Sequence, residues 1–323
     1  MITSMIKTPQ GLHIVEGLAE QDEQTSMLWL EINAPTAEES FALSERFGIN
    51  TDQQFSSVND TGKLLYLRTD LLALNAQDVP EFGRVSFILG DGVVATLCQK
   101  ADFHPFTHAI KRLQRKTSHY NTATAVLRIL LRVANDSADN VIDHITDALE
   151  QTSDKIFEIS EGFSADGREL GVQDLLKIMR TLNEKEELIS RCIEAQLSLA
   201  RTVRYLNSEV DNITEVELQE LVNELADDVA GVKEHAYFEH EKVRYLQNAV
   251  TNILNIKQNQ IVKVFTIITA VFLPPTLVGT FYGMNFSVMP ELAWKHGFMY
   301  SMILTVGAAL LPLVYIKHKG WLR

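Results

Sequence analysis

One face of the helix predicted near the C-terminus carries a line of side-chain oxygens. In steps of three and four residues from Asn248 to Thr280, eight of the ten positions are Asn or Thr. They are Asn248, Asn252, Asn255, Asn259, Thr266, Thr269, Thr276 and Thr280, with Val262 and Leu273 between them. These steps follow the helical period, so the oxygens share one side of a mostly apolar helix. Neutral hydroxyl and amide oxygens suit a cation that keeps its water shell, and the absence of a carboxylate disfavours a proton relay.

Periodicity alone leaves two interpretations of this polar stripe. Threonine and small residues form hydrogen bonds between neighbouring membrane helices, so the stripe could join helices. Polar side chains in a membrane span also face water, so the stripe could line an aqueous path. Two spans cannot enclose a channel, and the second interpretation therefore requires several copies of the chain around an axis.

The stripe runs into the first of two apolar segments that are long enough to cross a membrane. Residues 261–282 contain one charge, Lys263, near their start, and residues 297–316 contain none. Both reach the length of a spanning helix. We therefore expect transmembrane helices over 261–282 and 297–316, with a connecting loop over 283–296.

Basic residues predict the orientation of these spans. Lys257 and Lys263 lie at the start of the first span, whereas the connecting loop has only Lys295. The second span is followed by a basic tail, 317–323. Positive charge concentrates on the cytoplasmic side of a membrane, so both termini are expected in the cytoplasm and the loop outside.

The chain before the spans is acidic and is predicted to combine strands with long helices. The sequence has 29 Lys and Arg against 42 Asp and Glu, a net charge of −13, and only Glu291 among the acidic residues follows position 250. A capping box at Thr36–Glu39 predicts a helix start, and Gly90-Asp91-Gly92 predicts a hairpin between 85–89 and 93–97. Strands are also expected at 27–32 and 64–67.

These features indicate an α+β membrane protein with an acidic cytoplasmic α/β domain, a long-helix stalk and two C-terminal transmembrane helices. The expected boundaries are an α/β domain over 1–110, a helical region over 111–231 and a stalk helix over 232–260. Gly231 is a candidate break or bend in the last long helix.

Composition excludes several classes of function. The negative charge disfavours nucleic-acid binding, which relies on Lys and Arg. Two cysteines, Cys98 and Cys192, cannot form a disulfide framework or a thiolate zinc site within one chain. No phosphate-binding loop of the G-x-x-x-x-G-K-[ST] type and no serine–histidine–acid or cysteine–histidine arrangement is evident. We therefore expect neither enzymatic activity nor an organic cofactor.

The loop between the spans carries a specific signature. It begins Tyr282-Gly283-Met284-Asn285, continues Met289-Pro290-Glu291-Leu292, and the chain ends with a basic KHKGW tail. Here the sequence resembles the CorA family of magnesium channels, specifically over 243–323 and through architecture alone over 1–242. The resemblance implies a homopentamer in the bacterial inner membrane that passes Mg²⁺, and also Co²⁺ and Ni²⁺, into the cytoplasm.

The resemblance also implies roles for individual residues. Gly283, Met284 and Asn285 would form the selectivity filter for the hydrated ion, and Glu291 would concentrate cations at the entrance. The bulky Phe265 and Val262 fit an apolar gate near the cytoplasmic end. The predicted pore lining consists of Asn259, Val262, Phe265, Thr269, Leu273 and Thr276, to which the periodicity adds Thr266 and Thr280.

Regulation is a further implication of the resemblance, since family members close when cytoplasmic Mg²⁺ bridges carboxylates of adjacent chains. An acidic pentamer would repel itself unless cations bound between its subunits. The candidate regulatory ligands are Glu220, Glu224, Asp227 and Asp228 in the helical part, with Asp70 and Asp91 in the α/β part. Each of these carboxylates also fits an ordinary solvated charge, as do His235 and His240 among the charges of the stalk.

Two alternative functions remain open. The first is a zinc transporter of the same superfamily, of the ZntB type, although Met284 in the signature favours magnesium. The second is a membrane-anchored scaffold or enzyme whose spans only tether it, a role that needs no continuous polar stripe.

Overall fold

The computed structural model describes residues 1–9, 11–19, 25–52, 57–75, 79–90, 92–115, 122–161, 171–210, 216–284 and 289–320, with the backbone alone at 161, 207–210, 216–221 and 291–292. The chain divides into two compact units. The first comprises Met1–Glu158 and Lys177–Gln247, and the second comprises Ile159–Leu176 and Asn248–Arg323.

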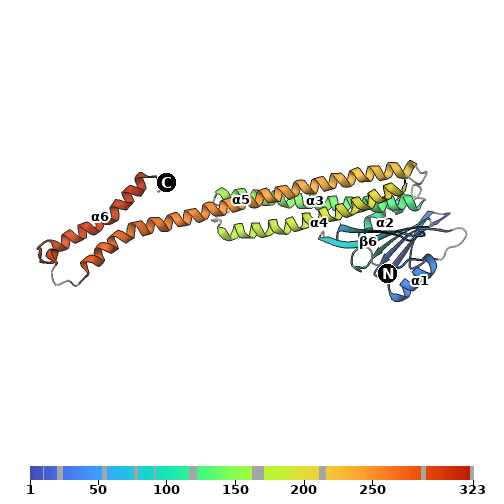
Figure 1. Ribbon diagram of the computed structural model, residues 1–323, viewed down its shortest axis with the longest axis horizontal. Coiled ribbons are helices and arrows are strands. Elements are labelled where there is room, and N and C mark those ends of the chain that lie inside the picture. The colour runs from blue at the N-terminus through green and yellow to red at the C-terminus, as the bar shows by residue number, and fades with distance from the viewer. Residues whose placement is uncertain are drawn as a thin grey trace. The chain divides into compact units, whose positions relative to one another are not determined.

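A seven-stranded sheet forms the start of the first unit (Figure 1). Its strands are β1 (Ile2–Thr8), β2 (Gly11–Glu16), β3 (Ser26–Asn33), β4 (Val58–Asp60), β5 (Leu65–Leu74), β6 (Pro80–Gly90) and β7 (Val93–Cys98). Their order across the sheet is β2-β1-β3-β7-β6-β5-β4, in which only β3 and β7 pair in parallel. The predicted hairpin is confirmed, because Gly90 pairs with Val93 and Gly92 adopts a φ of 75°.

Both faces of the sheet are covered, which explains the apolar run in β3. Trp29 faces one core together with the long helices, whereas Leu30 and Ile32 face a second core that includes Leu43 of α1 (Ala37–Phe47). The predicted capping box of α1 is present: the Glu39 amide donates to Thr36 Oγ1 at 3.2 Å, and the Thr36 amide donates to Glu39 Oε2 at 2.8 Å.

Three strands, β1, β2 and β4, were missing from the sequence prediction. β1 and β2 form one edge of the sheet, and the pairing of β1 with β3 shifts register between Met5 and Ile6. This irregularity breaks the alternation of apolar and polar residues that identifies a strand in a sequence. Ser4 is fully buried in β1, where its hydroxyl accepts a hydrogen bond from the Ala19 amide.

Four further helices lie wholly or mainly in the first unit: α2 (Thr107–Arg115), α3 (Ala123–Glu161), α4 (Val172–Val210) and the first part of α5 (Val216–Tyr282). The last three of these lie alongside one another in Figure 1. Apolar residues recur along α3 with the helical period, and they are buried: Val126, Ile129, Leu130, Val133, Val141, Ile145 and Leu149.

The last long helix has no break at Gly231. α5 continues through this glycine and through Pro274 and Pro275 to Tyr282, over 67 residues. Buried Val229, Val232 and Ala236 flank the glycine, so packing compensates for the roughly 1 kcal/mol by which glycine weakens a helix. The boundary expected between the helical region, 111–231, and the stalk helix, 232–260, therefore does not coincide with the end of a helix.

The second unit contains the remainder of α5, the short 3₁₀ helix η1 (Pro290–Ala293) and α6 (Gly297–His318). Two helices in the described residues are long and apolar enough to cross a membrane, α5 through its segment Val222–Tyr282 and α6 over Gly297–His318. Their apolar windows are 0% and 6% buried within the chain, so they are not core helices of a soluble domain.

One buried carboxylate stands out in the sheet. Glu31 of β3 is 7% exposed, and its Oε1 accepts a 3.4 Å hydrogen bond from Asn33 Nδ2. Burial raises the pKa of Glu31, because desolvation outweighs the opposing effects of Asn33 and His104.

Candidate functional site

The residues predicted to line a pore lie on α5 with exposed side chains. Asn259, Thr266, Thr269, Thr276 and Thr280 are all exposed. The apolar members of the set are exposed to similar degrees, 55% for Val262, 66% for Phe265 and 65% for Leu273. A face of large apolar and polar side chains left this open in a single copy is typical of a surface that lipid or another protein copy covers.

The hydroxyl groups of the stripe are all oriented by their own helix. Thr266 Oγ1 donates to the Val262 carbonyl at 2.8 Å, and Thr269 Oγ1 donates to the Phe265 carbonyl at 2.9 Å. Thr276 and Thr280 donate in the same way to the carbonyls four residues before them, at 2.7 and 2.8 Å. Each hydroxyl has thereby used its only hydrogen, so its oxygen can only accept a further hydrogen bond.

An acceptor-only surface is chemically matched to a hydrated cation. The water molecules around Mg²⁺ direct their oxygens toward the metal and their hydrogens outward, and Mg²⁺ gives up this water reluctantly. A wall of hydroxyl oxygens that cannot donate presents the complementary partner to those hydrogens. Within the stripe, Asn259, Val262 and Thr266 border a surface depression together with Lys263.

The predicted selectivity loop starts directly at the end of α5. The Gly283 amide donates to the carbonyls of Gly279 and Thr280 at 3.0 and 3.2 Å, and the Met284 amide donates to Phe281 at 3.3 Å. A Cβ atom on residue 283 would lie 3.3 Å from the Gly279 carbonyl oxygen, a tight contact that explains a glycine here. Met284 is 41% exposed, and Asn285 lies outside the described residues.

The far end of the loop is attached to the second span. Trp294 and Tyr300 contact each other edge to face with ring centroids 5.9 Å apart, and the Gly297 amide donates to the Trp294 carbonyl at 3.1 Å. Glu291 lies in η1, and its side chain lies outside the described part.

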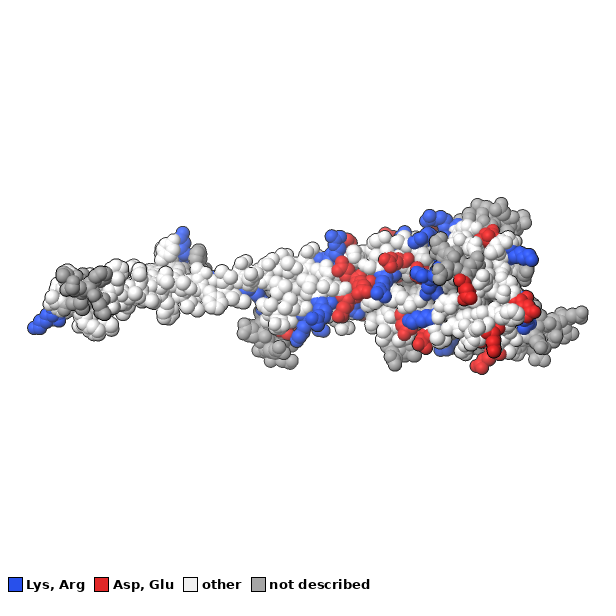
Figure 2. Space-filling view, turned by 60° about the horizontal axis from the view of Figure 1, so that its bottom comes forward, with Lys and Arg blue, Asp and Glu red and all other residues white. Residues whose placement is uncertain are grey.

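Charged side chains gather on the first unit and are sparse on the apolar helices (Figure 2). Two of the candidate regulatory carboxylates, Glu224 and Asp228, have basic partners on α3. Arg128 of α3 contacts Glu224 at 2.8 Å, and Arg132 contacts Glu224 at 3.3 Å and Asp228 at 3.9 Å. With Leu225 these four residues surround a small depression. The structure thus brings Glu224 and Asp228 together and places two guanidinium groups beside them.

The other regulatory candidates are not brought to this cluster. Asp70 lies on β5, where its Oδ1 accepts a 2.9 Å hydrogen bond from Arg84 Nε. Asp227 is exposed and forms no ion pair with a residue that the structure describes. Asp91 and the side chain of Glu220 lie outside the described residues.

Comparison with protein families identifies the relationship. A family model described as "CorA-like Mg2+ transporter protein" matches residues 24–318, nearly the whole chain. The chain belongs to the CorA family. The resemblance read from the loop and tail is therefore confirmed, and CorA membership extends over the acidic part as well as over the spans.

Individual CorA proteins share this architecture. The magnesium transport protein CorA of Pasteurella multocida is 28% identical over 312 residues, which cover 93% of each chain. The complete structure of the CorA magnesium transporter from Methanocaldococcus jannaschii matches 98% of both chains, with a TM-score of 0.76 at 19% identity. The cytoplasmic domain of ZntB from Vibrio parahaemolyticus matches 78% of this chain, with a TM-score of 0.57 at 10% identity. The expected fold, an α/β domain with long helices and two C-terminal apolar helices, is confirmed by this CorA likeness.

Sequence reasoning missed the arginines that face the acidic residues of α5. Arg128 and Arg132 are one helical turn apart on α3, matching the spacing of Glu224 and Asp228 on α5. The interacting residues are 96 positions apart in the chain, so no local pattern reveals the contact. Matched pairs of opposite charge at i and i+4 on two predicted helices were the only available signal.

Proposed function

We propose that several copies of this chain, most simply five, form a passive channel that imports hydrated Mg²⁺ down its electrochemical gradient. Co²⁺ and Ni²⁺ are expected to share the route, since the proposed lining recognises a water shell rather than a bare ion. The relatives' names and the Gly283-Met284-Asn285 signature support magnesium as the principal ion. The observation that carries the proposal is the row of exposed threonine hydroxyls on α5. Each of them donates its hydrogen to a carbonyl of its own helix, so its oxygen can only accept a further hydrogen bond.

In this proposal each part of the path has a separate task. Gly283, Met284 and Asn285 form the outer filter, where carbonyl and amide oxygens bind the water shell and Glu291 attracts cations. Thr280, Thr276, Thr269 and Thr266 continue the path inward with Leu273 and Asn259. Val262 and Phe265 close the inner part as apolar rings, which exclude water when they approach one another.

The proposed topology assigns the regions of the chain to the two sides of the inner membrane. Residues 1–110, 111–231 and 232–260 form the cytoplasmic α/β domain, helical region and stalk. The spans are 261–282 and 297–316, the loop 283–296 lies outside, and the tail 317–323 lies in the cytoplasm. The distribution of Lys and Arg around the spans supports this orientation.

Uptake into vesicles tests the ion and the mechanism together. The purified full chain in liposomes is offered Mg²⁺, Co²⁺ and Zn²⁺ separately, and we expect Mg²⁺ uptake that falls by about tenfold or more in Asn285→Ala. Ser301→Ala, which removes a hydroxyl from the second span, serves as the control and retains uptake. Preference for Zn²⁺ over Mg²⁺ would favour the ZntB-type function, and no flux of any ion would favour a tether.

The role of the hydroxyl oxygens has its own test. Thr276→Val keeps the side-chain shape and removes the acceptor, whereas Thr276→Ser keeps the acceptor. We expect slow Mg²⁺ uptake in the valine variant and nearly normal uptake in the serine variant. Thr305→Val is the matched control, because Thr305 of α6 makes the same hydrogen bond to its own helix, at 2.7 Å. Equal losses in Thr276→Val and Thr305→Val would support the helix-joining interpretation.

Regulation by cytoplasmic Mg²⁺ is the second part of the proposal. Bound between subunits, Mg²⁺ would bring carboxylates of adjacent chains together and hold the channel closed. The test is channel opening against cytoplasmic Mg²⁺ in a variant with Glu224, Asp227 and Asp228 all changed to Ala. If the variant requires a higher Mg²⁺ concentration for inhibition than the wild type, the result supports a regulatory role of these three carboxylates. If inhibition is unchanged, the regulatory ligands are Glu220, Asp70, Asp91 or other residues.

A further inference from the structure

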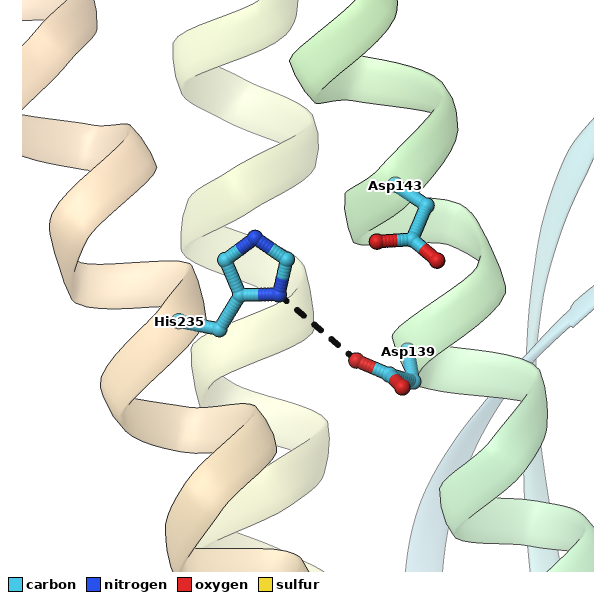
Figure 3. A group of neighbouring side chains, drawn as sticks. All are labelled: Asp139, Asp143 and His235. Atoms are coloured by element: carbon cyan, nitrogen blue, oxygen red, sulfur yellow. Dashed lines mark ion pairs between the residues drawn. The ribbon is translucent and has the colours of Figure 1, made fainter.

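A mixed carboxylate and imidazole cluster lies in the first unit, and it shares no residue with the proposed pore lining or with the arginine-paired carboxylates. Asp139 and Asp143 are one turn apart on α3, and His235 extends toward them from α5 (Figure 3). One ligand atom from each of the three residues lies within 4.8 Å of the other two. His235 Nδ1 and Asp139 Oδ1 are 3.6 Å apart.

The position of this cluster is fixed by the packing of two helices in register. Arg128 faces Glu224 with a separation of 96 residues, and Asp139 faces His235 with the same separation. α3 and α5 therefore run in parallel over this stretch. Buried Ala138 and Ile142 of α3 and buried Ala236 of α5 adjoin the three polar residues in sequence, and buried Val232 lies three residues before His235. A backbone held by such packing gives a partly preformed site.

The ligand set distinguishes this cluster from a magnesium site. Imidazole binds Zn²⁺, Co²⁺ and Ni²⁺ well, whereas Mg²⁺ prefers oxygen ligands and retains its water. Two ligands of a tetrahedral Zn²⁺ ion lie about 3.4 Å apart when each bond is close to 2.1 Å, which is near the 3.6 Å between His235 and Asp139. Two carboxylates and one neutral imidazole would balance the charge of a divalent ion, and water can complete its coordination from the exposed side.

We propose that Asp139, Asp143 and His235 form a binding site for a divalent transition-metal ion within one protomer, which ties α3 to α5. The site goes beyond the proposed transport function, because it needs neither a pore nor a second subunit. Bound metal would stabilise the first unit by linking two helices that are distant in the chain. An ion pair between His235 and Asp139 alone is the competing explanation of the geometry, and this explanation assigns no role to Asp143.

The test is metal binding to the purified full chain in detergent, in millimolar Mg²⁺ so that oxygen-only sites are occupied. Zn²⁺ is titrated while the melting temperature is followed, and Co²⁺ is titrated while its visible ligand-field absorption is followed. We expect the wild type to gain melting temperature with Zn²⁺ and to develop a Co²⁺ absorption that Zn²⁺ abolishes. His235→Gln and Asp143→Asn are expected to weaken both responses by about tenfold or more in metal concentration.

His240→Gln is the matched control. His240 lies on the same helix, is similarly exposed, and pairs with a single carboxylate, Glu186, at 3.7 Å. This variant should keep both metal responses. Asp143→Asn keeps the His235–Asp139 ion pair and changes an exposed residue, so it separates metal binding from the ion pair even if His235→Gln fails to fold. Wild-type responses in Asp143→Asn, or their equal loss in His240→Gln, would overturn the proposal.

Discussion

At the scale of single residues, the carboxylates of the chain differ in the side chains that surround them. Glu224 and Asp228 are held by arginines of the same chain, Asp70 is held by Arg84, and Glu31 is buried next to Asn33. These surroundings determine which carboxylates can bind a cation readily. A carboxylate beside a guanidinium must exchange that partner for Mg²⁺, so the arginines are expected to set the concentration at which the proposed sensor responds.

The first prediction concerns Arg132, which contacts both Glu224 and Asp228. In Arg132→Gln the two carboxylates lose a positive neighbour, so half-inhibition by cytoplasmic Mg²⁺ should occur at a concentration about two- to tenfold lower. The measurement is Mg²⁺ uptake at graded internal Mg²⁺. Arg112→Gln makes the same charge change at an ion pair with Asp136 and should leave the curve unchanged. A curve in Arg132→Gln identical to the control would contradict the regulatory assignment.

The second prediction concerns Glu31, whose pKa burial raises above the ordinary 4.5. A carboxyl group with a raised folded-state pKa adds stability below about pH 4.5 and loses it as the pH rises through the folded value. Glu31→Gln removes this loss, so its melting temperature should exceed that of the wild type near pH 7 and match it near pH 4. Glu45→Gln, at an exposed position of α1, is expected to differ from the wild type at neither pH.

At the scale of secondary-structure elements, α5 takes part in both units. Its first part packs on α3 and α4 through the buried residues Val222, Leu225 and Val229, whereas no side chain of its last part, residues 251–282, is buried within the chain. The same helical period therefore presents an apolar stripe to a core in one part and a polar stripe among apolar residues in the other. Only the second pattern requires a membrane or further copies to cover it.

Cysteine accessibility can map the orientation of that second part. The native thiols do not interfere, since Cys98 and Cys192 are buried, and burial raises the pKa of both, that of Cys192 to about 12. Thr269→Cys should react with a small hydrophilic thiol reagent in open channels, because residue 269 is proposed to face water. Ile268→Cys lies at the same depth but about 100° around the helix and should react slowly. Equal rates at the two positions would contradict a one-sided aqueous face.

Much of this arrangement follows from local patterns, whereas the contacts between elements do not. The Thr36 capping box, the Gly90–Val93 hairpin, the core face of α3 and both apolar helices could be predicted from the sequence. The strands β1, β2 and β4 could not, because a register shift interrupts the pairing of β1 with β3, β2 has no buried residue, and β4 has only three residues. The Asp139–His235 contact and the arginine pairs join residues 92 or 96 positions apart, and only the packing of α3 against α5 creates them.

At the scale of the whole molecule, net charge and membrane potential set the energetics of the proposed import. The chain carries a formal charge of −13, and a pentamer would carry five times as much, so cations are needed to reduce its self-repulsion. The proposed path itself needs no fuel. The movement of a divalent cation across 100 mV toward the negative side releases about 4.6 kcal/mol, at roughly 2.3 kcal/mol for each charge.

This energy leads to a prediction for reconstituted vesicles. An interior-negative potential of 100 mV should support Mg²⁺ accumulation of roughly three orders of magnitude at equilibrium, and collapsing the potential should slow uptake without any change in ATP. The measurement compares initial uptake rates at potentials set by potassium gradients and valinomycin. Uptake that depends on ATP and ignores the potential would contradict a passive channel. Native mass spectrometry of the same preparation is expected to give five subunits.

The hydrogen bonds from the threonine hydroxyls of α5 to their own helix affect which ions the proposed path excludes. Between Thr266 and Thr280 each described hydroxyl hydrogen is committed to the backbone of its own helix, so this stretch offers no hydroxyl hydrogen to a chloride or phosphate ion. An anion there would lose hydration without compensation. A conduit lined in this way would discriminate by sign of charge while carrying no fixed charge on its wall, and it would not trap the dication it conducts.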